Sequence, residues 1–175
     1  MPSPLIGVFM KRHIWIIAWL LFMMSIGLHA VTRIVDITGA GQYTSIQTAV
    51  TASSAGDTVL VYPGRYIENV NISISNLTVV SLEYTSNDPS FIESTIIDGN
   101  MNASGIRINQ NIQDIRIQGF SITNSKSGIV LGQNSVSIIA NCAIHGNASS
   151  YGGGINLFKG TTVLSGVRIF NNYAY

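Results

Sequence analysis

Apolar and polar residues alternate in short runs through most of the chain after residue 57, and these runs end in Gly, Asn or Ser. Such alternation predicts short, half-buried β-strands joined by tight turns. Residues 44–53 follow a helical pattern instead, because Ile46, Ala49 and Val50 fall at i, i+3 and i+4 behind Thr44 or Ser45 as N-cap. The pattern therefore predicts an all-β domain with one short helix near its start.

The alternation recurs with a period of about two dozen residues. Two columns of equivalent positions show this period: Phe120, Cys142 and Val167, and Gly105, Gly128 and Gly154. The steps are 22 and 25 residues in the first column and 23 and 26 in the second. Periods of this size indicate coils of two or three strands, each stacked on the next about 4.8 Å away. We therefore expect residues 31–175 to be the N-terminal portion of a right-handed, single-stranded parallel β-helix.

Some segments depart from the regular coil. Residues 83–94 are polar and contain Asn87-Asp88-Pro89, so we expect a loop that bulges out. Asn124 and Asn171 close equivalent strands, which predicts the start of an amide ladder, with solvated turn asparagines as the alternative. The sequence stops at Tyr175, just after a predicted strand. Because solenoids need both ends covered, we expect truncation in mid-coil, with the missing C-terminal part of the same chain as a partner.

The first 30 residues have the layout of a signal peptide. Lys11 and Arg12 precede an apolar run that begins at Ile14, and small and polar residues follow as far as Ala30. We expect residues 1–30 to be a signal peptide, with Met10 as an alternative start. The apolar stretch 14–28 is shorter than the roughly 20 residues that span a bilayer, and an uncleaved anchor is the alternative. The expected location is secreted, periplasmic or cell surface, with membrane contact through this segment alone.

Charge and cysteine content exclude some classes of protein. Charged residues make up 10% of the chain, and after residue 30 seven basic residues stand against eight acidic ones. Such a balance lacks the basic footprint of a nucleic-acid-binding protein. Cys142 is the single cysteine, so an intramolecular disulfide or a cysteine-based metal site cannot form within one chain. We expect Cys142 to be a small buried apolar residue.

The start of the predicted solenoid carries the most specific motif. Residues 39–50 read Gly-x-Gly-x-Tyr-Thr-Ser-Ile-Gln-x-Ala-Val, residues 56–64 read Gly-Asp-Thr-Val-Leu-Val-Tyr-Pro-Gly, and Tyr66-x-Glu68 follows. This stretch resembles the opening of pectin methylesterases and other pectate-lyase-like β-helix proteins. The resemblance covers residues 33–75 in detail and the remainder by repeat pattern. It implies a β-helix whose open N-terminal end is capped by the 44–53 helix.

The catalytic residues that this resemblance implies are not matched. Pectin methylesterases use two aspartates, as nucleophile and general acid/base, with glutamines nearby. The corresponding segments, 127–131, 146–150 and 171–175, contain neither residue type. We therefore predict no catalytic residue, no cofactor-binding residue and no metal ligand in this chain. We also expect His145, the one histidine after residue 30, to be structural.

A lyase of the same fold would need a different set of groups. Such enzymes use a calcium ion held by clustered carboxylates and a basic residue that abstracts a proton, and calcium prefers several oxygen ligands together. Asp98 and Asp114 are the available carboxylates, and Arg107, Arg116 and Lys126 are the available bases. Exposed-face positions account for all five without chemistry. Calcium is therefore expected only if the protein is lyase-like.

Aromatic residues of the last two predicted coils suggest a ligand. Tyr151, Phe158 and Tyr173, together with Arg107 and Arg116, are the candidate carbohydrate contacts, because sugar rings stack on aromatic faces. We expect a secreted or cell-surface β-helix module that binds a polysaccharide or cell-surface glycan or acts as a scaffold or adhesin. The Gly-Gly-Gly-Ile and Phe-x-Asn spacing at 152–172 also resembles repeats of autotransporter-type and polymorphic outer-membrane surface proteins.

An enzyme is the alternative interpretation of the same fold. In that case the chain is part of a carbohydrate-active enzyme, namely a polysaccharide lyase, a hydrolase or a pectinesterase-like protein. Its active coils would lie beyond residue 175.

Overall fold

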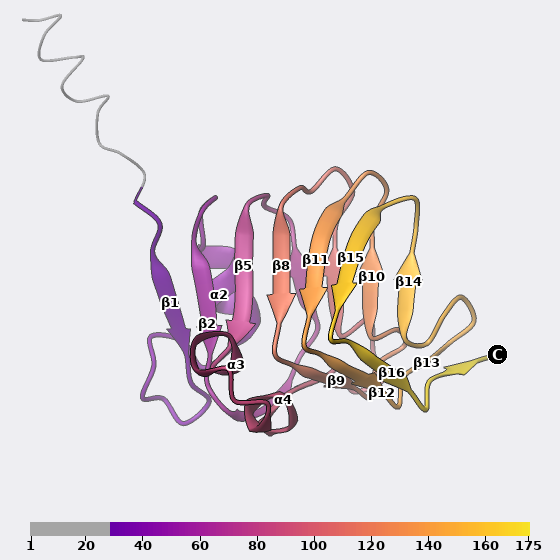
Figure 1. Cartoon of the computed structure of the whole chain (residues 1–175), viewed down its shortest axis with the longest axis horizontal. Helices are drawn as coiled ribbons and strands as arrows, with labels where there is room; N and C mark the ends of the chain where they lie inside the picture. The colour runs from indigo at the N-terminus through magenta and orange to yellow at the C-terminus, as the bar shows by residue number, and fades with distance from the viewer. Residues whose placement is uncertain (1–28) are drawn as a thin grey trace, which may run out of the picture.

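A computed structural model describes residues 29–175, which form three parallel β-sheets and a separate pair of short parallel strands (Figure 1). The predicted signal segment, residues 1–30, lies outside the described residues except for His29 and Ala30. Sheet A contains β1 (Thr32–Val35), β2 (Thr58–Val61), β5 (Leu77–Ser81), β8 (Ile115–Gln118), β11 (Val136–Ala140) and β15 (Thr161–Ser165). Sheet B contains β3 (Gly64–Ile67), β6 (Thr95–Asp98), β9 (Ser121–Thr123), β12 (Ala143–His145) and β16 (Arg168–Phe170).

The third sheet completes each turn of the chain. Sheet C contains β4 (Val70–Ile72), β7 (Ile106–Ile108), β10 (Ile129–Leu131) and β14 (Ile155–Leu157), and the short strands β13 (Ala148–Ser149) and β17 (Tyr173–Ala174) pair with each other. The chain visits sheets A, B and C in turn and then returns to A one strand further along. This order is that of a parallel β-solenoid, so the predicted all-β class and the repeat are confirmed.

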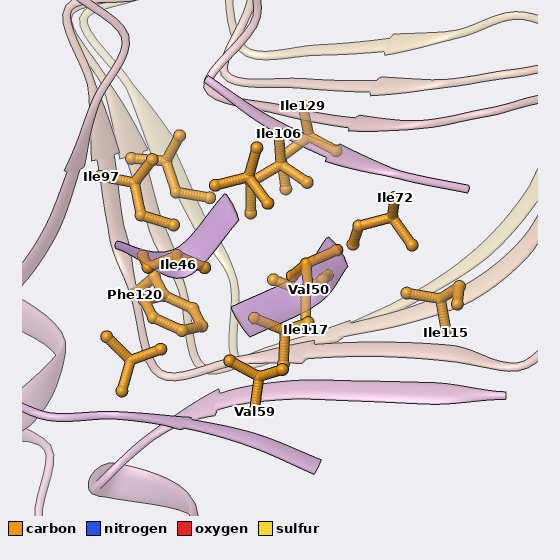
Figure 2. Close-up of a cluster of buried hydrophobic side chains, with 14 of the residues drawn as sticks. Ile46, Val50, Val59, Ile72, Ile97, Ile106, Ile115, Ile117, Phe120 and Ile129 are labelled. Atoms are coloured by element: carbon orange, nitrogen blue, oxygen red, sulfur yellow. The ribbon is translucent and has the colours of Figure 1, made fainter. Parts of the chain in front are cut away.

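The core lies between the three sheets and consists of stacked aliphatic side chains. Ile117 of β8 pairs in register with Ile139 of β11, and Ile122 of β9 pairs with Ile144 of β12. Each of these four side chains is fully buried. Figure 2 shows residues of all three sheets meeting in this interior, with Phe120 among them. Cys142 is buried among the same residues, as predicted.

Helix α2 (Ile46–Ala52) forms where the sequence predicts it. The hydroxyl of Ser45 accepts a hydrogen bond from the Thr48 amide at 3.3 Å, so Ser45 is the N-cap. Its apolar residues Ile46, Ala49 and Val50 are buried, and the helix contacts β1, β2 and β4. The Glu68 side chain stabilises the first turn of α2 by accepting a hydrogen bond from the Ile46 amide at 2.8 Å. That α2 caps the open end of the solenoid remains a prediction.

The predicted glycine column lies immediately before the strands of sheet C, where coils approach closely. A Cβ atom on Gly128 would lie 2.4 Å from Cγ2 of Ile144 in sheet B. Equivalent Cβ atoms on Gly105 and Gly154 would lie 2.6 Å and 2.7 Å from the Cγ2 atoms of the equivalent isoleucines, each in the following coil. These distances are far inside van der Waals contact. The repeat in the sequence therefore records a steric requirement of the turn from sheet B to sheet C.

The amide ladder forms one residue later than predicted. Asn124 and Asn171 occupy left-handed turn positions, with φ of 52° and 51°. The ladder lies at the next position, where Asn147 Oδ1 accepts the Ser125 amide at 2.9 Å and Asn172 Oδ1 accepts the Asn147 amide at 3.1 Å. The prediction of the turn was therefore correct, and the prediction of its ladder residues was wrong.

The segment predicted as a loop contains two short helices, α3 (Glu83–Ser86) and α4 (Ser90–Ser94). Glu83 is buried and accepts hydrogen bonds from the Gln118 side chain at 3.0 Å and the Asn141 side chain at 2.7 Å. Because both donors belong to later coils, the sequence around residue 83 does not reveal them. Helix α4 contacts β6 and β9 of sheet B. The segment is therefore a folded insertion that covers part of sheet B.

Candidate functional site

A groove of about 800 Å³ lies on the outer face of sheet C. Its floor contains Arg107 of β7, Val130 of β10 and Asn156 of β14, which are register partners in adjacent strands. Their side chains point outward because side chains alternate along a strand, and the flanking residues of β7 and β10 are buried in the core. The floor therefore presents one side chain per coil along the solenoid.

Two walls flank this floor. The wall that precedes the strands contains Asn102, Ala103, Ser104, Lys126, Ser127, Ser149 and Tyr151. The wall that follows the strands contains Asn109, Gln110, Gly132, Gln133 and Phe158. Most of these side chains are amides or hydroxyls, which can both donate and accept hydrogen bonds. The groove can therefore contact the hydroxyl groups of a ligand from both sides.

Charge and aromatic residues give the groove a definite character. Arg107 and Lys126 line it, and within residues 29–175 no carboxylate does. Tyr151 and Phe158, one from each wall, are 84% and 64% exposed. Aromatic rings this exposed offer apolar faces on which a flat ligand can stack. The groove therefore has the groups to attract an anion and to stack against a ring.

The structure separates the five predicted carbohydrate contacts. Arg107, Tyr151 and Phe158 come together in this groove. Arg116 lies on β8 of sheet A, where it donates to the Gln118 side chain at 3.1 Å, and Tyr173 lies on β17, outside the groove lining.

Sequence reasoning named Lys126 as an available base of a lyase but not as a carbohydrate contact, and it missed the amide side chains of the groove walls. Part of the floor had a signal in the sequence. Arg107, Val130 and Asn156 each follow a Gly-Ile pair of the glycine column, so they occupy one outward register position. These residues can be recognised as a groove floor only once that position is known to lie on the outer face of a sheet.

Asp98, one of the two carboxylates considered for a lyase-like site, has structural partners. Asp98 is buried, pairs with Arg65 and accepts hydrogen bonds from the Asn124 side chain at 2.7 Å and the Asn100 amide at 2.8 Å. Burial raises the pKa of the Asp98 carboxyl, but these hydrogen bonds and Arg65 outweigh it, so the pKa lies below its ordinary value. Asp114 lies in the left-handed turn that precedes β8.

Within residues 29–175, no three His, Cys, Asp or Glu side chains come together as a metal site would require. In the same part of the chain, no helix reaches the length and hydropathy needed to cross a bilayer.

The chain matches no protein-family model, and no match to it is found among curated proteins. The resemblance to pectate-lyase-like proteins is therefore carried by the motif at residues 33–75. The stacked parallel sheets are compatible with it.

Proposed function

We propose that this protein is a secreted or cell-surface, right-handed β-helix module that binds an acidic polysaccharide or cell-surface glycan along the outer face of sheet C. The observation that carries the proposal is the groove lining. Two cations, Arg107 and Lys126, lie among amide and hydroxyl groups, and the exposed rings of Tyr151 and Phe158 flank them. The signal-like segment at residues 1–30 supports export.

An acidic glycan fits these groups better than a neutral one. Arg107 and Lys126 have no carboxylate beside them in the described groove lining, so an anionic ligand meets uncompensated positive charge. The amides of the two walls suit sugar hydroxyls, and the two rings suit the apolar face of a sugar. Each contact is weak, since exposed ion pairs contribute about 0.2–1 kcal/mol. Useful affinity therefore requires a polymer that makes several contacts at once.

The repeating floor supports a linear ligand. Arg107, Val130 and Asn156 are stacked with the coil spacing of about 4.8 Å. A polymer that lies along the solenoid axis meets a new set of floor and wall residues at each coil. The same surface serves a scaffold or adhesin whose partner is a cell-surface glycan. In either setting the groove binds ligand without a chemical step.

Affinity electrophoresis tests the proposal with polygalacturonate and its fully methyl-esterified form as acidic and neutral probes on one backbone. We expect the acidic polymer to retard the protein more. The double variant Arg107→Gln/Lys126→Gln removes about 1 kcal/mol of ion pairing, a loss of roughly fivefold in affinity. Tyr151→Ala weakens binding to both polymers, because stacking does not depend on ligand charge.

Matched controls come from outside the groove. Arg116→Gln removes a cation from sheet A, and Tyr84→Ala removes a half-exposed ring from α3. Both controls should bind the acidic polymer as the unmodified protein does. Equal retardation by both polymers would refute the acidic-ligand proposal. An equal loss in the groove variants and the controls would refute the location.

A further inference from the structure

A second pocket, of about 410 Å³, opens on the outer face of sheet B, away from the groove on sheet C. Strands β9 and β12 supply Ser121 and His145 to its floor, and β16 supplies Phe170. Glu93 of the insertion helix α4 forms one side of it. The insertion therefore turns part of an otherwise open sheet face into a walled pocket.

Ser121 and His145 are hydrogen-bonded within this pocket. Ser121 Oγ lies 3.0 Å from His145 Nε2. Ser121 lies on the outer face of the sheet because its neighbour Ile122 is fully buried in the core, and Ser121 itself is 6% exposed at the pocket floor. The imidazole stacks on the ring of Phe170, with centroids 4.9 Å apart and planes 15° apart. A serine hydroxyl and a histidine nitrogen at this distance have the geometry of a nucleophile and its general base.

We propose that Ser121 and His145 form such a pair and hydrolyse short acyl esters, such as O-acetyl groups. This activity goes beyond glycan binding and uses a different face of the solenoid. The size of the pocket and its apolar floor at Ile96, Ala143 and Phe170 suit a small acyl group. Two guanidinium groups, of Arg65 and Arg168, also line it.

The proposed reaction is a hydrolysis in which water is the only co-reactant. Ser121 Oγ forms a bond to the ester carbonyl carbon while its proton passes to His145 Nε2, which accepts it in the tautomer protonated at Nδ1. The bond from that carbon to the alcohol oxygen then breaks, and the alcohol leaves with the proton from His145. Water repeats the sequence on the acyl-serine, which releases the carboxylic acid and restores the serine hydroxyl.

Arg168 is the group best placed to stabilise the oxyanion. Its ion pair with Glu93 is long, at 3.4 Å, and the two side chains are 60% and 76% exposed. Such a pair contributes little to stability, so the guanidinium is free to reorient toward a negative charge in the pocket. Arg65 is less available because it is paired with the buried Asp98. Arg168 therefore stabilises the oxyanion in this reaction.

Covalent labelling of the full chain with a fluorophosphonate probe tests the pair directly, with mass spectrometry to locate the adduct. We expect one adduct on Ser121 and slow hydrolysis of p-nitrophenyl acetate. Ser121→Ala removes both, whereas Ser165→Ala, at an exposed serine of β15, leaves both unchanged. His145→Gln slows labelling about 100-fold or more, because general-base catalysis contributes at least that factor.

Circular dichroism and urea unfolding establish that each variant is folded before its reactivity is compared. Absence of a Ser121 adduct in the folded, unmodified protein would overturn the proposal. An adduct that forms equally fast in folded His145→Gln would overturn it as well. Glycan binding is measured separately, so either result leaves the sheet C groove untouched.

Discussion

Replacing the buried side chain of Asn147 tests how the coils are held together at the turn from sheet B to sheet C. The side chain is fully buried. Its Oδ1 accepts the amide of Ser125 at 2.9 Å, and its Nδ2 donates to the carbonyl of Ile122 at 3.1 Å. Both groups belong to the preceding coil. Asn147→Ala therefore deprives these two backbone groups of the preceding coil, as well as the His145 carbonyl and the Asn172 side chain, of this partner in a site that water does not reach.

The size of the effect follows from those two groups. A buried polar group left without its partner costs about 1–3 kcal/mol. Partial collapse of the site relieves some of this cost, so we expect a loss of about 3 kcal/mol in the free energy of unfolding. Asn147→Ser should lose less, because a hydroxyl can still accept a hydrogen bond and Ser125 occupies the same place one coil earlier.

Equilibrium unfolding in urea, followed by circular dichroism, measures this loss from the midpoint at constant slope. Asn71→Ala is the matched control, since Asn71 lies on β4 with its side chain exposed, and we expect a change within about 0.5 kcal/mol. A loss below about 1 kcal/mol in Asn147→Ala, or one equal to that of Asn71→Ala, would show that the ladder does not stabilise the stack.

Three further results are expected. Gly128→Ala should destabilise the fold by about 1–3 kcal/mol in the same urea assay, because the new Cβ meets Ile144; an unchanged midpoint would contradict the steric argument. Burial raises the pKa of the Cys142 thiol to about 12, so iodoacetamide at pH 8 should modify it only after unfolding, as intact mass measurement will show. Burial alone would raise the pKa of Asp57 and Asp98, but hydrogen bonds and arginines outweigh it and hold both pKa values below the ordinary value of an aspartate. Because each folded pKa lies below its unfolded value, this stabilisation is complete above the unfolded pKa and disappears as pH falls through the folded one. The urea concentration at the unfolding midpoint should therefore fall when the pH is lowered below about 4. Asp98→Asn should make this midpoint less dependent on pH.

The repeat could be predicted from the sequence because stacking imposes the same requirement on every coil. Gly105, Gly128 and Gly154 recur since a Cβ atom has no room there in any of the three coils. The ladder was predicted one residue too early because asparagine suits two adjacent positions of the turn for different reasons. Asn124 tolerates the left-handed turn, and Asn147 supplies the buried amide.

The contacts that the sequence did not reveal depend on which strands lie side by side. Ser121 and His145 meet only once β9 and β12 are placed in register. Arg107 and Arg116 look alike in the sequence, yet one lies in sheet C and the other in sheet A. Glu83 likewise finds its partners in Gln118 and Asn141, far along the chain. The local sequence pattern predicts a strand, but only the register between coils shows in which sheet that strand lies and which side chains it meets.

The register of sheet C also places the side chains of the groove floor at a fixed interval. Because Arg107, Val130 and Asn156 are ladder partners, their spacing is set by backbone hydrogen bonds at about 4.8 Å and not by side-chain flexibility. A polymer whose repeat is commensurate with this interval keeps every unit in phase with the coils, whereas one with another repeat falls out of phase within a few units. Selection among glycans would then act on the length of the repeating unit as well as on its charge.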